Sequence, residues 1–466
     1  MIGPVNQMEA LFTSLIGGNA LRQRILRLID EVSTLAHSNS VDLHIMTFAF
    51  TDAKIARALE NAAVDCPSLH IRVLADWSQR IRFRGQQVGG LAGLNLPNLE
   101  IRYNYDQPYI WDAQAGHMRW SYHASRGLLH HKTLGVLVNG RPWQMILGSF
   151  NWTAAAVKGY ENLLVLSSEQ AAALPVMARM ELEFEALWSD GRVSLSPQEA
   201  HLHYQAILEQ FGRNPATQPA EIRGLQQGAG THLASLDPEC YPSRYKDHDG
   251  STGALQRATE GVAAIAFGWR GLEKTPGPGG CAEQNRSQCM ILRSSLNRLR
   301  YVPLTMTNLA LEAISDAKTG DTLKVAMYGM SARVPEYGAL INAARRGVRI
   351  LLVLDRLAGA HVHSRLQSAA QKEGLAIEVK TAGRMMHQKY LVHVESGTVL
   401  TGTANMSTDA STRHSEHRIL IRGCTKLAAQ FSADFDEIWA RLSASVDSAG
   451  RKEERSEPLS SSSELP

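Results

Sequence analysis

The distribution of apolar residues predicts a strand–helix–strand unit near the start of the chain. Residues 8–37 carry apolar side chains at helical spacing and predict a long helix. Residues 41–48 form a dense apolar run that predicts a strand, and Asp52 has the position of an N-cap before a helix over 55–63. Residues 70–76 predict a second strand. A helix between two strands implies parallel pairing and a sheet covered by helices.

The same pattern returns in the second half of the chain, which indicates an internal duplication. Residues 323–328 predict a strand, 334–344 a helix and 347–355 a second strand. Asp76 and Asp355 end the second strand of the two units. Because the similarity extends over whole units, we expect two related lobes.

The duplication divides the chain into five parts. These are an N-terminal segment (1–17), a first lobe (18–200), an inter-lobe insertion (201–299), a second lobe (300–445) and a tail (446–466). The insertion is rich in Gly, Pro, Asp and Ser. Since a connection of this length is either disordered or functional, we expect it to shape the substrate cleft. Residues 262–269 within it predict a strand, and the composition of the tail predicts disorder.

The composition is that of an ordinary globular protein. The 466 residues are 44% apolar and carry a formal charge of +3, so no global charge favours nucleic acid or an anionic membrane. No apolar run has the roughly 18 residues of a membrane span, and no signal peptide is visible at the start. These features predict a cytoplasmic monomer. None of the five cysteines has C-x-x-C spacing, so neither a metal nor another cofactor is expected.

Two short strings with the same order of chemical groups occur in the two halves. Alternate residues of a strand share a face, so the His and the Lys of each H-x-K string point the same way. A further strand then leads into a turn with a small hydroxyl residue and an Asn, and a Glu follows. The first set is His130, Lys132, Ser149, Asn151 and Glu161, and the second is His387, Lys389, Thr403, Asn405 and Glu416. The repetition favours one site built from both halves.

Two such sets facing one another could cleave a phosphodiester. One imidazole attacks phosphorus while the other protonates the leaving alcohol. Two Lys and two Asn side chains stabilise charge on the phosphoryl oxygens without a metal, and each Glu fixes a His tautomer. Ser149 and Thr403 are expected either to bind substrate or to form the turns. Which Glu serves which His stays open, and the scheme requires His130 and His387 to face each other across one crevice.

The two strings resemble the signature of the phospholipase D superfamily, H-x-K-x4-D followed by a G-S-x-N turn. Residues 148–151 read G-S-F-N and 402–405 read G-T-A-N. Leu137 and Val394 stand where the signature has Asp, which the tyrosyl-DNA phosphodiesterases also lack.

The resemblance implies a fold and a division of roles. The fold would be α/β, with two α/β/α lobes that have central mixed β-sheets and are related by an internal pseudo-twofold axis. One active site would lie at their interface. By the same resemblance His130 would be the nucleophile, and His387 would act first as general acid and then as base.

We therefore predict a phospholipase D-like phosphodiesterase that hydrolyses or transphosphatidylates glycerophospholipids through a phosphohistidine, in peripheral contact with a membrane surface. Two alternatives stay open: a nuclease on the same scaffold, and a non-catalytic phosphate-binding protein. The balanced charge lacks the basic stripe of a duplex binder, which favours lipid over nucleic acid. Arg80, Arg82 and Arg84 could contact phosphate or form a solvated loop. His131 and His393 are predicted to be structural.

Overall fold

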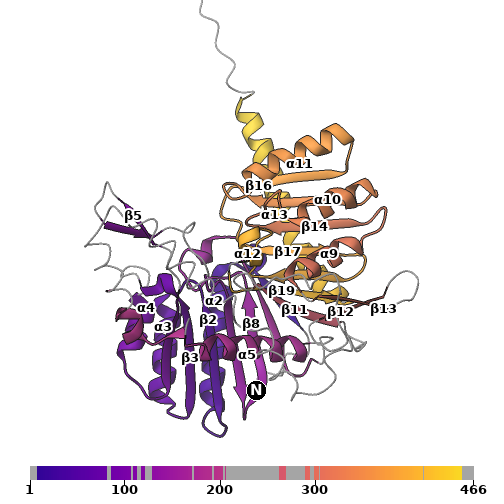
Figure 1. Cartoon of the computed structure of the whole chain (residues 1–466). Coiled ribbons are helices and arrows are strands. Elements are labelled where there is room, and N and C mark those ends of the chain that lie inside the picture. The colour runs from indigo at the N-terminus through magenta and orange to yellow at the C-terminus, as the bar shows by residue number, and fades with distance from the viewer. Residues whose placement is uncertain are drawn as a thin grey trace, which may run out of the picture.

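The computed structural model contains two α/β lobes that meet along one seam (Figure 1). The described residues are 8–80, 86–105, 109–112, 117–120, 128–170, 173–191, 194–202, 205, 262–268, 289–293, 299–303, 305–412 and 414–453.

The first lobe is built on a mixed sheet with the strand order β1-β9-β8-β7-β2-β3-β4-β10. Its strands are β1 (Glu9–Phe12), β2 (Val41–Thr47), β3 (Leu69–Asp76), β4 (Leu99–Asn104), β7 (Lys132–Val138), β8 (Arg141–Gly148), β9 (Asn162–Ser167) and β10 (Ser194–Leu195). Strands β2, β3 and β4 run parallel, whereas β7, β8 and β9 form an antiparallel meander that pairs with β2. The first H-x-K string therefore enters β7 at the centre of the sheet, and the G-S-x-N turn follows β8.

The second lobe repeats this arrangement in a sheet with the order β11-β19-β18-β17-β14-β15-β16. Its strands are β11 (Val262–Gly268), β14 (Thr322–Met327), β15 (Arg349–Asp355), β16 (Ile377–Ala382), β17 (Lys389–His393), β18 (Thr398–Gly402) and β19 (Glu416–Arg422). Strands β14, β15 and β16 are parallel, and β17, β18 and β19 form the matching meander. The duplication read from the sequence is thus a duplication of topology.

One matching pair of strands lies outside the ranges predicted for the lobes. β1 and β11 each pair antiparallel with the last strand of a meander, β9 or β19. β1 belongs to the predicted N-terminal segment and β11 to the predicted insertion, where it agrees with the strand expected at 262–269. A further hairpin joins β12 (Cys289–Arg293) of the predicted insertion to β13 (Leu299–Pro303), which crosses the predicted boundary at 299. The expected cleft-shaping role falls largely on residues outside the described part.

The helix predicted over residues 8–37 is wrong at its start. After β1 the chain forms α1 (Thr13–Ile16) and α2 (Gly18–Leu35), separated by Gly17 with φ +78°. In β1 the side chains of Ala10 and Phe12 alternate with less buried ones, so an extended chain buries a single face. That face packs on the last helix of the chain, where the rings of Phe12 and Phe431 meet edge to face at 4.9 Å.

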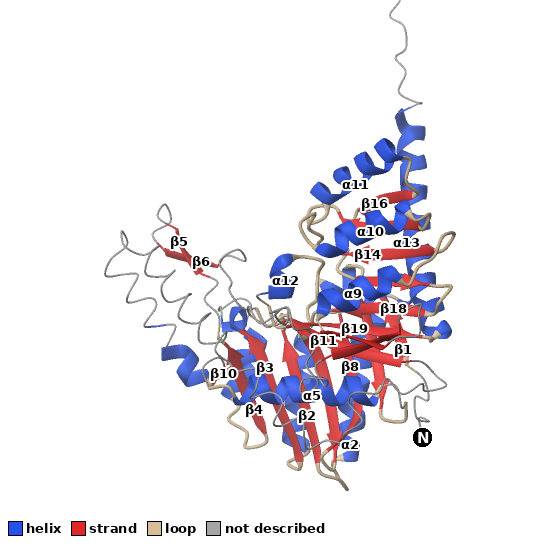
Figure 2. Cartoon of the chain, turned by 45° about the vertical axis from the view of Figure 1, so that its right-hand side comes forward, coloured by secondary structure: helices blue, strands red, loops and turns tan. Residues whose placement is uncertain are grey.

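Helices cover both faces of each sheet, which makes each lobe an α/β/α sandwich (Figure 2). In the first lobe α2, α3 (Ala53–Asp65) and α4 (Gln86–Gly93) pack on one face and α5 (Leu174–Ser189) on the other. In the second, α9 (Met306–Ser315), α10 (Pro335–Arg345) and α11 (Ala360–Glu373) lie opposite α13 (Thr425–Glu453). Short elements are η1 (Trp77–Arg80), η3 (Ala156–Lys158), α12 (Thr408–Thr412) and the hairpin of β5 (Tyr109–Asp112) and β6 (His117–Trp120).

The seam between the lobes is part of one hydrophobic core. Helix α5 of the first lobe contacts β11 of the second, and α13 of the second contacts β1 of the first. Leu129 and Leu147 share this core with Met386 and Ile419. The seam is therefore held by buried apolar surface, which fixes the two H-x-K strings relative to each other. Within the described residues, no helix is both long and apolar enough to cross a membrane.

Candidate active site

Two backbone bridges join the lobes where the H-x-K strings begin. The amide of His130 donates to Ser415 O, and that of His387 donates to Tyr160 O, each at 2.9 Å. Ser415 and Tyr160 directly precede the Glu of each motif set. Each histidine is thus placed by the backbone of the opposite lobe, beside that lobe's carboxylate.

The two imidazoles face each other across the seam. Their ring centroids are 6.4 Å apart and their planes meet at 75°. His130 is 5% exposed and His387 7%, so both are buried but reachable. A phosphorus between the rings would lie about 3–3.5 Å from each reacting nitrogen, a total span of the same order as the 6.4 Å between the ring centroids. The structure brings together the two histidines on which the sequence scheme depends.

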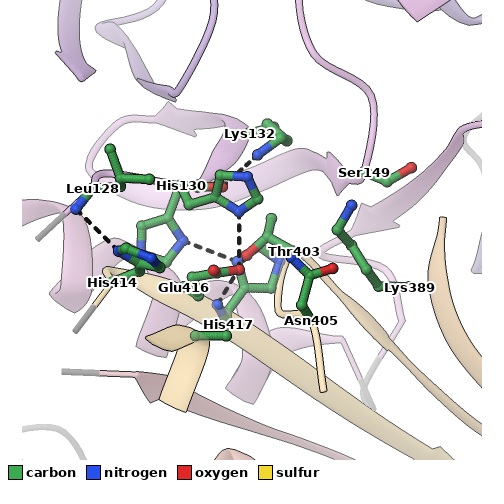
Figure 3. A network of polar contacts seen from close by, with 12 residues as sticks. Leu128, His130, Lys132, Ser149, Lys389, Thr403, Asn405, His414, Glu416 and His417 are labelled. Carbon is green, nitrogen blue, oxygen red and sulfur yellow. Dashed lines mark hydrogen bonds and ion pairs between the residues drawn. The ribbon is translucent and has the colours of Figure 1, made fainter. Parts of the chain in front are cut away.

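The carboxylates pair crosswise with the histidines. Glu416 Oε2 lies 3.0 Å from Nδ1 of His130, and Glu161 lies 2.9 Å from Nδ1 of His387. Figure 3 shows the first of these contacts between the His130 ring and the carboxylate. Because Nδ1 is used in both dyads, each Nε2 is left to act on a substrate. The pairing that the sequence left open is therefore between lobes: each lobe supplies the carboxylate for the other lobe's histidine.

The two lysines are buried beside the histidines. Each ammonium donates to the backbone carbonyl of the histidine two residues earlier, and Lys132 and Lys389 are only 1% and 2% exposed. Aromatic rings lie against them: Lys132 Nζ is 5.1 Å from the ring centroid of Phe48, and Lys389 Nζ is 5.1 Å from that of Tyr328. Such cation–π contacts hold the ammonium groups in place.

Sequence reasoning missed both of these rings. Phe48 and Tyr328 also contact the two imidazoles edge to face, at 4.7 and 5.3 Å. Each ring directly follows the first strand of its unit, β2 or β14. An aromatic residue at matching positions of the two repeats was the signal that could have found them.

The glycines of the two turns permit a close approach of backbones. Gly148 and Gly402 have φ of +148° and +147°, a conformation that L side chains rarely adopt. A Cβ at either position would collide with the carbonyl of Asn162 or His417 on the neighbouring strand. The meander can therefore deliver the following hydroxyl residue and Asn to the seam only with Gly at these positions.

The hydroxyls of Ser149 and Thr403 brace the meander. They are fully buried and accept hydrogen bonds from the amides of Asn162 at 2.9 Å and His417 at 3.1 Å. Thr403 also bonds to the side chain of Glu416, which offsets part of the rise that burial causes in the pKa of that carboxyl. These contacts support the turn-forming alternative for both residues, and direct substrate binding by them stays a prediction.

The two asparagines differ in their contacts. Asn405 Oδ1 accepts the amide of Gly329 at 3.2 Å, and its carbonyl accepts from the buried Arg418 guanidinium at 2.7 Å. Among the described residues, Asn151 Oδ1 is buried without a hydrogen-bond partner. A buried amide oxygen left unsatisfied is costly, and a ligand that donates a hydrogen bond would satisfy it.

Asp76 and Asp355 hold the loops around the site. One carboxylate oxygen of Asp76 accepts the amide of Leu129, and one of Asp355 accepts that of Met386, at 2.9 and 3.2 Å. Both amides lie directly before a motif histidine. The sequence showed the matching positions of these aspartates but not their task, which is to anchor the start of each H-x-K string.

Burial dominates the electrostatics of the site. It lowers the pKa of Lys132 to about 7 and that of Lys389 to about 8, and in the case of Lys132 repulsion by Lys389 adds to the effect. Burial raises the pKa of Glu416 to about 8. Burial thus disfavours the charged forms of these groups, and an anion between the two lysines would stabilise their ammonium forms.

Burial and nearby lysines also lower the pKa of both histidines, but not equally. Burial, with Lys132 and Lys389 adding to it, holds the pKa of His130 well below its ordinary value of 6.5, even though Glu416 lies 3.0 Å from its Nδ1. In the case of His387, the charge and hydrogen bond of Glu161 partly offset the effect of burial. The Nδ1 of His387 also lies 3.1 Å from the Ser149 carbonyl. The imidazolium form is therefore better supported at His387 than at His130.

Other predicted residues lie apart from this centre. His131 is fully buried, with Nδ1 3.0 Å from Nδ1 of His417, and the two rings are stacked. His393 bonds to Asp321 at 3.0 Å near the end of the β17–β18 hairpin. Both positions agree with the structural roles predicted for them. Arg80 lies over the ring of Trp77, while Arg82 and Arg84 fall outside the described residues.

Two clusters in the described part of the chain have the composition of metal ligands. His44, Glu181 and Glu185 form the first, but the guanidinium of Arg72 lies among them and bonds to His44 and Glu185. The second is the His393 group with Asp321 and Glu395. Neither contains a residue of the two motif sets, so they have no evident part in the chemistry at the seam.

The fold and the site together define a two-lobed phospholipase D-like protein with one composite centre. A family model described as "Cardiolipin synthase, PLD-like domain" matches residues 32–188 and 310–439, more than half of the chain. The chain belongs to this family. The resemblance drawn from the two H-x-K strings is thereby confirmed.

Individual relatives are more distant. A protein named Phospholipase D from Rickettsia prowazekii (strain Madrid E) is 29% identical over 139 residues, which cover 30% of this chain and 65% of the relative. A protein of the same name from Rickettsia typhi (strain ATCC VR-144 / Wilmington) is 31% identical over 104 residues, 22% of this chain and 50% of the relative. The chain thus matches less than two thirds of the length of either relative.

A solved structure shows the same fold over nearly the whole chain. Phosphatidylserine synthase from Haemophilus influenzae Rd KW20 superimposes with a TM-score of 0.56 at 13% identity, covering 94% of this chain and 87% of that one. At this identity the similarity concerns the fold alone. The predicted fold class, two α/β/α lobes with mixed sheets, is confirmed.

Proposed function

We propose that this protein is a phosphodiesterase or phosphatidyltransferase that acts on glycerophospholipids through a phosphohistidine at His130. One observation carries the proposal: two His–Glu dyads, each built from both lobes, face one another at 6.4 Å with two buried lysines beside them. A site that only held phosphate would need the lysines, but it would not need two adjacent imidazoles whose Nδ1 atoms are both held by a carboxylate.

In the first step, Nε2 of His130 attacks phosphorus and the bond from phosphorus to the leaving alcohol breaks. The proton that the alkoxide needs comes from Nε2–H of His387, whose imidazolium is supported by Glu161. The products of this step are an alcohol and a phosphoramidate at His130. Lys132 and Lys389 offset the charge that grows on the phosphoryl oxygens.

In the second step, the oxygen of water or of an acceptor alcohol attacks phosphorus. Nε2 of His387, now neutral, takes the proton of the attacking group. The nitrogen–phosphorus bond breaks and His130 returns to its neutral form. Water as the attacking group gives hydrolysis, and an alcohol gives transphosphatidylation, so the same residues serve both outcomes.

The assignment of roles is supported by the difference between the two dyads. A nucleophile must be neutral, and burial holds the pKa of His130 well below its ordinary value, which favours the neutral imidazole. A general acid must hold a proton, and His387 has the better supported imidazolium. Both features favour the order that the family resemblance implied.

Lipid is the favoured substrate class for two reasons. The matched family is described by a lipid-synthesising activity, and the relatives and the superimposable structure have names that refer to phospholipids. The balanced charge of the chain also gives no general basis for binding a duplex. A nuclease on the same scaffold is the alternative.

One experiment separates the candidates. The purified protein is incubated in EDTA with phosphatidylcholine vesicles or with single-stranded DNA, and released choline and cleaved ends are measured. We expect choline release that is lost in His130→Ala and His387→Ala. DNA cleavage alone would indicate the nuclease. Loss of activity in EDTA would contradict the metal-free scheme, and a folded but inert protein would indicate a phosphate-binding function.

A further inference from the structure

Two exposed apolar side chains lie in the loops next to His387. Leu357 follows β15 and is 83% exposed, and Met385 precedes the histidine by two residues and is 50% exposed. No other large apolar residue of the described part is as exposed as Leu357. Isolated exposed apolar residues are normal on soluble proteins, so these two are significant only if they form one surface.

A single buried carboxylate ties the two loops together. Asp355, 7% exposed, accepts the amides of Leu357 and Ala358 on Oδ1, at 2.9 and 3.1 Å. Its Oδ2 accepts the amide of Met386 at 3.2 Å. The two apolar side chains are therefore presented by one anchored edge beside the catalytic centre.

The surroundings of these side chains are basic. Arg356 and Arg384, both exposed, directly precede Leu357 and Met385. The guanidinium of Arg384 lies over the ring of Tyr160, 3.8 Å from its centroid, which holds it at the seam. Residues 356–372 contain three Lys or Arg and two His but no Asp or Glu. We call Arg356, Leu357, Arg384 and Met385 the basic rim.

We propose that the basic rim docks the protein on an anionic lipid surface, with the Leu and Met side chains among the lipids and the arginines beside the net negative head groups. The inference rests on the proposed lipid function and extends it to the surface on which the enzyme works. Apolar side chains flanked by Arg are typical of residues at a membrane interface. Single-stranded nucleic acid instead binds on aromatic platforms, and the exposed side chains of the rim are aliphatic.

Vesicle binding by the full chain tests this inference without requiring turnover. Co-sedimentation is measured with vesicles of phosphatidylcholine alone and with added phosphatidylglycerol, for the wild type and for Leu357→Asn/Met385→Gln. We expect the double variant to bind both vesicle types about tenfold more weakly, from the apolar area withdrawn from the lipid. Arg356→Gln should lose affinity only for the anionic vesicles. Val64→Asn, which alters a residue 55% exposed on α3, is the matched control and should bind like the wild type.

The outcomes separate the docking role of the basic rim from the proposed chemistry at the seam. If the wild type and the double variant bind equally, and thermal unfolding shows that both are folded, the docking role is wrong. Failure of the wild type to bind any vesicle also contradicts it. Rim-dependent binding without choline release supports the docking surface but contradicts the proposed lipid activity. Retention on single-stranded DNA that weakens in the rim variants would assign the surface to nucleic acid and overturn the lipid proposal.

Discussion

Glu161 of the first lobe holds His387 of the second, with both carboxylate oxygens 2.9 Å from the imidazole Nδ1. The reciprocal pair joins Glu416 to His130 at 3.0 Å. Each dyad is therefore a contact between lobes, and neither lobe contains a complete one. The shared hydrophobic core along the seam supplies the rigidity that such a centre needs.

Glu161→Gln tests the role of His387 as general acid. The change keeps the shape of the side chain but removes the charge that supports the imidazolium. We expect turnover of an ordinary alkyl phosphodiester to fall by about 10²–10⁴-fold. A p-nitrophenyl ester has a leaving group that needs no proton, so a rapid burst of p-nitrophenol should persist and phosphohistidine should accumulate at His130. Rapid-quench assays and mass spectrometry measure both, and a lost burst would contradict the assignment.

Glu416→Gln should give the opposite pattern. Glu416 orients the nucleophile His130, whose attack is required whatever group leaves. The burst should therefore shrink with the p-nitrophenyl ester as well as with the alkyl ester, and little phosphohistidine should form. Comparing the two Gln variants with the same pair of substrates provides the internal control. If Glu416→Gln retained the burst and Glu161→Gln lost it, the roles of the two histidines would have to be exchanged.

Anion binding should depend on pH through the two lysines. Their pKa values lie at about 7 for Lys132 and about 8 for Lys389, below the ordinary value, because burial disfavours the ammonium form. A bound anion needs both ammonium groups, so affinity is fully present below the lower pKa and is lost as pH rises through the higher one. Isothermal titration with sulfate, whose charge is constant over this range, should show tighter binding at about pH 6 than at about pH 9.

The matched variant for this measurement is Lys389→Met. It should weaken sulfate binding at the lower pH and flatten the pH dependence, since one titrating cation is gone. Proton uptake, read from titrations in buffers of different ionisation heat, should accompany binding near neutral pH in the wild type. Equal affinity of the wild type at both pH values would show that the lysines do not hold the anion.

A buried ion pair supports the turn that carries Asn405. Arg418 donates to Glu336 at 2.6 Å and to the Asn405 carbonyl at 2.7 Å, and both charged side chains are 2% exposed or less. Glu336→Gln leaves the guanidinium buried without its counter-charge, so we expect a loss of about 3–5 kcal/mol in the free energy of unfolding. Urea denaturation measures it. Arg349→Gln, in an exposed pair with Glu378, should change stability little. A small effect of Glu336→Gln would show that water reaches the pair.

Hydrophobic periodicity and internal repetition were sufficient to predict much of the fold. The strand–helix–strand units, the strand at 262–269 and the match of Asp76 with Asp355 follow from local pattern, because strands and helices bury their faces with fixed periods. The start of the chain shows the limit. Four residues are too few to distinguish a helical from an extended pattern. Residues 9–12 are extended because they pair with β9, which the sequence does not show.

From the sequence alone came the identity of the ten motif residues, their order in two repeats and the chemistry that they support, since side-chain type and strand alternation are local properties. Tertiary structure alone decided that Glu161 serves His387 and Glu416 serves His130, and that Phe48 and Tyr328 lie over the lysines. The physical reason is that two equivalent repeats allow either pairing of carboxylate and histidine. The packing of α5 and α13 across the seam selects between them, through contacts between residues more than 200 positions apart.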